Sequence, residues 1–219
     1  LPNEGPFSQK SLTYSHQPSG DDRILPERRS DPLQIHQRRY LGSKQQLLGF
    51  IHEVLRENLS HPRSFGDLFA GTGVVGASLN CPETSIIANE LLYCNYCSLH
   101  AFLGAEAVDL KEYHCYLQYL REAGYPKDDY LARAYGGKYF GAADALTIGS
   151  MRQAIADLSL QGRMNSALIA TLLYSMDRIA NTCGHYDAFR LREPEDGLFC
   201  LRPLDLGSCK ENQGNRIYN

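Results

Sequence analysis

The sequence predicts an α/β fold in which parallel strands alternate with helices, and three observations support this. The short apolar segment 63–69, RSFGDLF, runs directly into a glycine-rich turn and a helix-forming segment, AGTGVVGASL. A second apolar segment at 83–90, ETSIIANE, ends in an acid. Another helix-forming segment then follows, LLYCNYCSLHAFL. Strand, helix, strand, helix in this order is typical of a parallel sheet with helical crossovers.

The segments before the first strand are of two kinds. Residues 1–37 are rich in Ser, Pro, Asp, Arg and Gln without a hydrophobic period, and we expect a flexible polar tail there. Residues 44–59 then carry apolar side chains at helical spacing, which predicts an amphipathic helix that packs on the rest of the fold. The apolar positions are Leu47, Leu48, Ile51, Val54 and Leu55.

The second half of the chain is predicted to be mainly helical. Helix-forming patterns occur at 110–123, 142–158 and 164–180, and a strand-like segment, LFCLRPLDL, occupies 198–206. There is no internal repeat. At 219 residues the chain is long enough for one domain with a substantial core.

Composition limits the class of protein. The net charge is only −3, so any contact with nucleic acid must come from a local patch. No apolar run is long enough to cross a bilayer and no secretion signal is visible, so we expect a cytoplasmic protein with no membrane partner. The seven cysteines are an odd number and suit reduced thiols. Cys94 and Cys97 form a C-x-x-C without a second ligand pair, so we expect no metal.

The glycine-rich turn predicts a binding site for an adenosine-containing ligand. Gly71 and Gly73 allow close approach of the backbone, and Glu90 ends the second strand, where an acid accepts hydrogen bonds from ribose hydroxyls. Both NAD and S-adenosylmethionine satisfy this pattern. Asp67 and Phe69, just before the turn, favour a sulfonium cation over a pyrophosphate.

Four stretches resemble, in order, the Dam-like family of DNA adenine-N6 methyltransferases, which are frequent in type II restriction-modification systems. They are RRYLGSKQQLLGFI, FGDLFAGTGVVG, ANELLYCN and LIATLLYSMDRIANTCGHYDAFR, and the resemblance covers residues 38–219. It implies a Rossmann-like S-adenosylmethionine-dependent methyltransferase fold. It also implies methyl transfer to the N6 amine of adenine in double-stranded DNA, without a metal.

The resemblance assigns residues that bind the methyl donor, S-adenosylmethionine. An N-terminal element, whose lysine lies near the methionine end of the donor, comprises Tyr40, Gly42, Ser43 and Lys44. The strand and loop that hold the methionine and its sulfonium comprise Asp67, Phe69, Gly71 and Gly73. Glu90 matches the acid that binds the ribose.

The resemblance also divides the chain. Residues 38–103 match the donor-binding part, 104–195 a helical target-recognition region, and 196–219 the start of a returning strand. The polar residues after the helix at 164–180 are candidates either for contact with DNA or for a polar turn that holds the helix. The DNA candidates are Asn181, His185, Tyr186, Arg190 and Arg192.

One family motif is absent from these residues. The family holds the flipped adenine with a D-P-P-Y loop, and the sequence contains no such tetrapeptide. We therefore expect a methyltransferase truncated in its C-terminal half, catalytically silent by itself, with its first strand unpaired along one edge. Two alternatives stay open. One is a split enzyme completed by a C-terminal polypeptide, and the other is a non-catalytic remnant that binds the donor or DNA.

Overall fold

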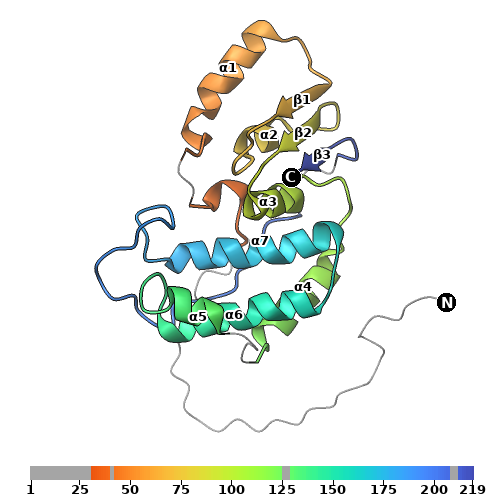
Figure 1. The fold of residues 1–219 in the computed structure, drawn as a ribbon. Helices are drawn as coiled ribbons and strands as arrows, with labels where there is room; N and C mark the ends of the chain where they lie inside the picture. The colour runs from red at the N-terminus through yellow and green to blue at the C-terminus, as the bar shows by residue number, and fades with distance from the viewer. Residues whose placement is uncertain (1–30, 40–41, 125–128, 208–211) are drawn as a thin grey trace, which may run out of the picture.

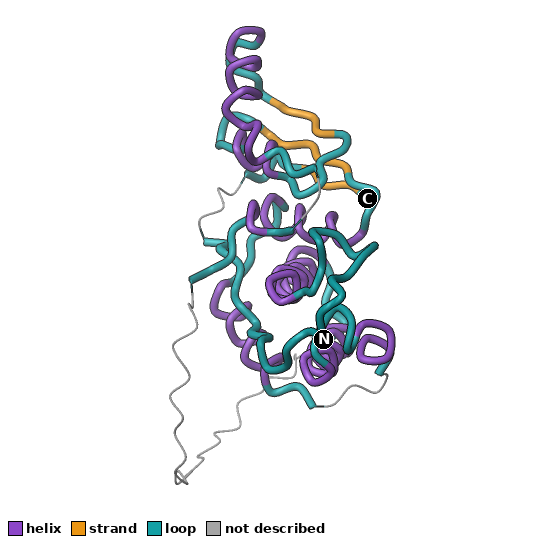
Figure 2. Tube along the Cα trace, turned by 90° about the vertical axis from the view of Figure 1, so that its left-hand side faces the viewer, coloured by secondary structure: helices purple, strands orange, loops and turns teal. Residues whose placement is uncertain are grey.

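The computed structural model describes residues 31–39, 42–124, 129–207 and 212–219 (Figure 1). Tyr40 and most of the predicted tail lie outside the described residues. In the described part, no helix combines the length and the apolar character that a bilayer span requires. The chain forms an α/β structure in which a small parallel sheet lies at one end and a group of helices at the other (Figures 1 and 2).

The sheet contains three described strands in the order β1-β2-β3, all parallel. Strands β1 (Ser64–Asp67) and β2 (Ser85–Asn89) confirm the two predicted strands. Strand β3 (Arg216–Tyr218) pairs with the other side of β2. It lies within residues 196–219, which the resemblance matches to the start of a returning strand, but outside the strand-like segment at 198–206. Among the described residues, β1 pairs with no strand on its outer edge.

Two asparagines before β3 fasten it to the sheet. Asn215 accepts a hydrogen bond from the Ile86 backbone N–H at 2.7 Å and donates to the Leu103 carbonyl at 2.9 Å. Asn212 donates to the carbonyls of Cys81 and Thr84. These side chains satisfy backbone groups at the start of β2 that a longer partner strand would otherwise satisfy.

The predicted strand at 198–206 is wrong. The only ladder contact there is an isolated bridge between Leu204 and Leu33. Pro203 has no backbone N–H to donate, and Leu201, Leu204 and Leu206 are buried. The alternating apolar pattern therefore reflects an extended segment packed on helices, not a member of the sheet.

The predicted helices are present, with one addition. The helix bounds are α1 Leu48–Asn58, α2 Val74–Leu79, α3 Tyr93–Leu103, α4 Leu110–Arg121, α5 Tyr130–Tyr135, α6 Ala142–Asp157 and α7 Gly162–Ile179, with short 3₁₀ turns at Ile35–Gln37 and Gln45–Leu47. Helix α5 was not predicted. Helix α3 lies between the sheet and α7, and α7 in turn packs on α6 and α4 (Figure 1).

The main core forms where α3 meets the sheet on one side and α7 on the other. Ile86 of β2, Leu99 and Phe102 of α3, and Leu168 and Tyr174 of α7 are all buried in one cluster. The ring centroids of Phe102 and Tyr174 lie 5.6 Å apart. Because α3 is buried on both sides, its position fixes the loop that precedes it, which carries Glu90.

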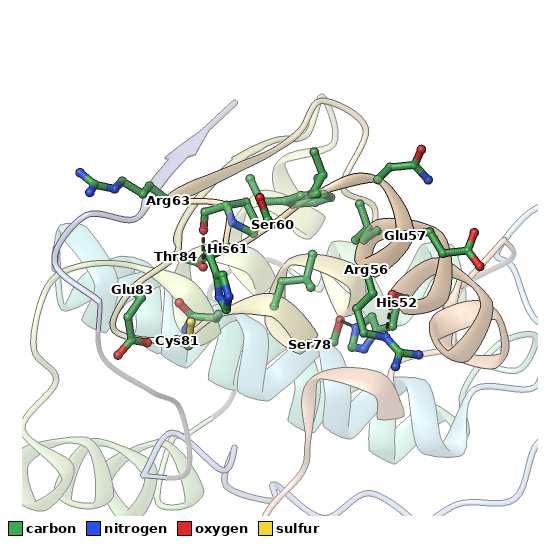
Figure 3. A pocket seen from close by; sticks show the side chains of 17 residues that line it. His52, Arg56, Glu57, Ser60, His61, Arg63, Ser78, Cys81, Glu83 and Thr84 are labelled. Atoms are coloured by element: carbon green, nitrogen blue, oxygen red, sulfur yellow. Dashed lines mark hydrogen bonds between the residues drawn. The ribbon is translucent and has the colours of Figure 1, made fainter.

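Helix α1 does not pack as the sequence predicted. None of its residues is buried, and Phe50 is 66% exposed. A hydrogen bond of 2.8 Å between His52 Nε2 and Ser78 Oγ links α1 to α2. Between α1 and the β1, α2 and β2 segments lies an open cavity of about 1260 Å³ (Figure 3). The apolar stripe of α1 is thus present, but in the described structure it covers little.

Candidate functional site

A cavity of about 330 Å³ lies at the carboxyl ends of β1 and β2, where ligands bind in open parallel sheets. We call it the strand-end cavity. It brings together three segments distant in sequence: the turn at 42–44, the glycine loop at 69–75, and Glu90. Its lining residues are Gly42, Ser43, Lys44, Phe69, Ala70, Gly71, Thr72, Val74, Val75 and Glu90. Most of the residues that the sequence assigned to the donor site therefore share one cavity.

The glycine loop needs glycine for two physical reasons. Gly71 and Gly73 have φ values of 56° and 78°, in the left-handed region that residues other than glycine rarely adopt. At Gly73, an added Cβ would also lie 2.3 Å from Cδ2 of Leu99. Gly73 therefore allows α2 to begin directly against α3, and it shapes the wall behind the cavity.

Replacing Gly73 by alanine is expected to destabilise the chain by about 2–4 kcal/mol, from the left-handed conformation and the overpacking together. The matched control is Gly49→Ala in α1, where no atom lies within 4 Å of the added Cβ and where alanine is the better helix former. Urea unfolding followed by circular dichroism measures both. Equal stability of the two variants would contradict the packing argument.

Glu90 is held by the backbone. Its Oε2 accepts a 2.7 Å hydrogen bond from the Gly71 N–H and its Oε1 accepts one of 3.1 Å from the Leu92 N–H, and the residue is 9% exposed. A carboxylate oxygen can accept more than one hydrogen bond, so each Glu90 oxygen keeps acceptor capacity for a ligand in the cavity. The carboxylate thus fixes the glycine loop and still offers acceptors to a ligand hydroxyl.

Asp67 lies at the tip of β1, beside the cavity lining. Burial raises the pKa of its carboxyl above the usual value; the Phe69 backbone N–H and the charge of Lys44 oppose this, and the charge of Glu90 adds to it. Asp67 therefore lies within reach of the charges of both Lys44 and Glu90. Two carboxylates and one ammonium leave a negative excess, which favours a cationic ligand.

Phe69 adds an apolar surface to this charged site. Its side chain is 84% exposed although it lines the cavity, and Leu68 and Leu91 beside the strand ends are exposed as well. An exposed aromatic ring at a cavity mouth offers a face on which a cation or a planar base can rest.

The residues proposed to face DNA divide into two groups. The Asn181 side chain is buried, and its amide nitrogen contacts the carbonyl oxygens of Lys138, Arg190 and Arg192 at 2.9, 3.1 and 2.9 Å. This supports the alternative of a polar turn for Asn181. His185 is half-buried and its Nδ1 lies 3.3 Å from Asp187 Oδ2. A DNA role for either residue stays a prediction.

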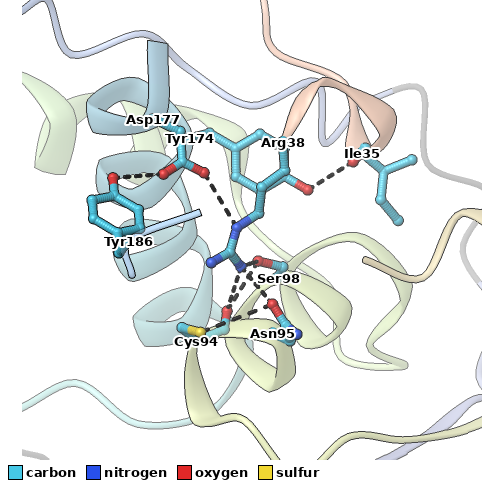
Figure 4. Close-up of polar contacts among 8 residues, drawn as sticks. All are labelled: Ile35, Arg38, Cys94, Asn95, Ser98, Tyr174, Asp177 and Tyr186. Atoms are coloured by element: carbon cyan, nitrogen blue, oxygen red, sulfur yellow. Dashed lines mark hydrogen bonds and ion pairs between the residues drawn. The ribbon is translucent and has the colours of Figure 1, made fainter. Parts of the chain in front are cut away.

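The Tyr186 hydroxyl points inward, although the residue as a whole is 37% exposed. Its hydroxyl donates to Asp177 Oδ1 at 2.9 Å (Figure 4). Its backbone carbonyl accepts from the Tyr139 hydroxyl at 2.7 Å. Burial, with the neighbouring Asp177 charge, raises the pKa of the Tyr186 hydroxyl, so it stays protonated and donates. Arg190 and Arg192 are instead exposed. Of the five candidates, these two arginines therefore retain the freest side chains.

A buried ion pair links the segment before Lys44 to α7 and was not predicted from the sequence. Arg38 Nε lies 3.4 Å from Asp177 Oδ2, and the Arg38 guanidinium also donates to the Cys94 carbonyl, Asn95 Oδ1 and Ser98 Oγ (Figure 4). It thus joins the segment leading to Lys44 with α3 and α7. The only signal in the sequence was a lone acid, Asp177, within the apolar pattern at 164–180.

Comparison with known proteins points to one family. Residues 40–200 match the model of the D12 class N6 adenine-specific DNA methyltransferases. The chain is 32% identical over 201 residues to Modification methylase LlaI of Lactococcus lactis subsp. lactis, a match over 83% of this chain and 32% of that protein. It is 28% identical over 203 residues to Type II methyltransferase M.FokI of Planomicrobium okeanokoites, over 83% and 31% of the two chains.

A third relative is Type II methyltransferase M.NlaIII of Neisseria lactamica, 29% identical over 180 residues, which are 76% of this chain and 52% of that protein. The chain thus spans between about a third and a half of the length of these relatives. No solved structure matches it.

Proposed function

The chain belongs to the D12 class N6 adenine-specific DNA methyltransferase family, and from this premise we propose that it forms the donor-binding part of such an enzyme. The complete reaction transfers a methyl group from S-adenosylmethionine to the N6 amine of adenine in double-stranded DNA. The names of the relatives support a place in a type II restriction-modification system.

The observation that carries the proposal is the composition of the strand-end cavity. It combines a left-handed glycine turn, a carboxylate with spare acceptor capacity, and a negative excess of charge around an exposed aromatic ring. A ribose and a sulfonium cation match these features. The two phosphates of NAD would instead add negative charge beside Asp67 and Glu90, which repels them.

Each residue takes a role that its contacts support. Glu90 accepts hydrogen bonds from the ribose hydroxyls, Asp67 and the Phe69 ring attract the sulfonium, and Lys44 attracts the carboxylate of the methionine part. The bound donor supplies an electrophilic methyl group on a cationic sulfur. The chain contributes orientation and exclusion of water at that methyl group.

The acceptor side of the reaction requires a pocket for the flipped adenine. The adenine pocket of the family depends on a D-P-P-Y loop, which residues 1–219 do not contain. We propose that a complementing polypeptide segment supplies it and pairs along the outer edge of β1, and that residues 104–195 contribute to target recognition. A remnant that binds donor or DNA without catalysis is the alternative.

The proposal is tested by titrating the chain with S-adenosylmethionine and with S-adenosylhomocysteine, whose sulfur is uncharged. Asp67→Asn is expected to weaken binding of the cationic donor about tenfold or more and binding of the neutral product much less, because only the sulfonium interacts with the lost charge. Calorimetry measures both, with Glu53→Gln on α1 as the control for a lost carboxylate.

The pH dependence gives a second readout. Burial raises the pKa of Asp67, so donor affinity is expected to fall as the pH is lowered through that value, and the dependence should vanish in Asp67→Asn. Equal losses for the cationic and the neutral ligand would contradict the sulfonium role. Displacement of the donor by NAD at comparable affinity would favour the dinucleotide alternative.

A further inference from the structure

We propose that five arginines form a binding site for the phosphodiester backbone of double-stranded DNA, separate from the strand-end cavity. They line a cavity of about 350 Å³, which we call the arginine basin. The arginines of the basin are Arg39, Arg178, Arg190, Arg192 and Arg202. The proposal rests on the proposed function, because it names the surface that would hold the substrate.

The basin is assembled from segments far apart in the chain. Arg39 follows the first 3₁₀ turn, Arg178 lies in the last turn of α7, and Arg202 belongs to the extended segment that crosses the helices. Arg190 and Arg192 come from the loop after α7, whose backbone carbonyls are held by the buried Asn181. The fold therefore brings five positive charges together, in a chain whose net charge is −3.

These charges have little compensation. No acidic residue lines the basin, and none of the ion pairs between described residues includes any of its five arginines. Asp177 attracts Arg39 from nearby, but it is buried and occupied by Arg38 and Tyr186. The positive charges in the cavity repel one another, and an anion placed among them is attracted to each, which offsets that repulsion.

The hydrogen bonds of the basin show which donors remain. Arg39 donates to the carbonyls of Ala180 and Arg178 at 3.2 and 3.4 Å, so part of its guanidinium is held at the end of α7. Arg202 donates to the Asp31 carbonyl, but its Nε is buried without a hydrogen-bond partner among the described residues. A buried guanidinium N–H without an acceptor is costly, and a phosphate oxygen in the basin would supply one.

The shape and chemistry of the basin fit a phosphodiester better than the methyl donor. The basin shares no lining residue with the strand-end cavity. Guanidinium groups match phosphate oxygens in a forked geometry, and contacts of this kind position DNA without reading its sequence. The basin would thus hold the DNA strand while other groups select the base.

The experiment compares Arg178→Gln/Arg190→Gln with the matched control Arg56→Gln/Arg152→Gln, which removes the same charge from α1 and α6. Affinity for duplex DNA is measured by fluorescence anisotropy at several salt concentrations. Each lost phosphate contact lowers the slope of log K against log salt by about 0.9, so the basin variant should lose about 1.8 and bind at least about tenfold more weakly at low salt. The control variant should keep most of the salt slope and most of the affinity for DNA.

A second variant, Arg178→Lys/Arg190→Lys, keeps the charges and should retain the salt slope with weaker binding, since lysine lacks the fork. Calorimetry with S-adenosylmethionine should give unchanged affinity in all variants. If the native chain does not bind the donor but the basin variant still loses DNA binding, the proposed function is wrong and the proposal of a phosphate site in the arginine basin is supported. Equal DNA affinity of the basin variant and the control variant would overturn the proposal.

Discussion

Replacing Arg38 by methionine is expected to cost about 3–5 kcal/mol of folding free energy, the usual penalty for leaving one partner of a buried ion pair alone. Asp177 is 3% exposed, so its carboxylate would stay buried, and among the described residues it would keep the hydrogen bond from the Tyr186 hydroxyl and the more distant charge of Arg39. The Asn95 and Ser98 side chains would lose a donor as well. Against a total stability of about 5–15 kcal/mol for a typical domain, this loss is large.

A double variant separates the pair from the rest of the site. In Arg38→Met/Asp177→Leu both charges are gone, and removing both partners of a buried pair often restores stability. We expect the double variant to be more stable than Arg38→Met alone in urea unfolding. The opposite order would show that the arginine acts mainly through its hydrogen bonds to α3.

The pH dependence of the stability of Arg38→Met follows from the direction in which the pKa of Asp177 is shifted. Burial raises the pKa of Asp177, although Arg38 lowers it, and removing Arg38 would raise it further. An acid with a raised pKa binds protons more readily in the folded than in the unfolded state, so folding stability falls as the pH rises through the window between the two values. The loss in Arg38→Met should therefore be smaller at acidic than at neutral pH. A loss that is the same at both would contradict this.

The features whose position could be predicted are those that depend on a short stretch of neighbouring residues. The glycine turn and Glu90 follow directly from strands of four or five residues, each of which precedes a helix, and nearby packing decides their position. The position of β3 within 196–219 was missed because three residues carry no period, and its place depends on Asn215 reaching β2, 129 positions away. Long-range contacts of this kind leave no pattern in one sequence.

Burial of polar side chains was also hard to predict. Arg38 was read as the start of the donor-binding part beside a polar tail, yet four groups on α3 and α7 surround its guanidinium. Asn181 and Tyr186 were placed among DNA candidates, but the Asn181 amide and the Tyr186 hydroxyl turn inward, because nearby backbone carbonyls and the buried carboxylate of Asp177 on α7 need donors. In each case the deciding partner comes from a distant segment.

Replacing Glu90 by alanine is expected to abolish donor binding, with a loss of about a hundredfold or more, because it removes both the ribose acceptor and the support of the glycine loop. The N–H groups of Gly71 and Leu92 would lose their acceptor, and hydrogen bonds to a charged group contribute about 1.5–3 kcal/mol each. Stability should therefore fall together with affinity. Calorimetry with S-adenosylmethionine and urea unfolding measure the two effects.

Glu90→Gln separates the acceptor from the charge. An amide keeps one oxygen and turns two N–H donors toward the second backbone N–H, so both stability and affinity should lie between those of the native chain and Glu90→Ala. Glu83→Gln, in the exposed turn before β2, is the control. The charge of Glu90 also raises the pKa of Asp67, so in Glu90→Gln the pH below which donor binding weakens should move down. An unchanged pH dependence of donor binding would mean that the two carboxylates do not act on the same ligand. It would contradict the proposal that they share one site for a cation.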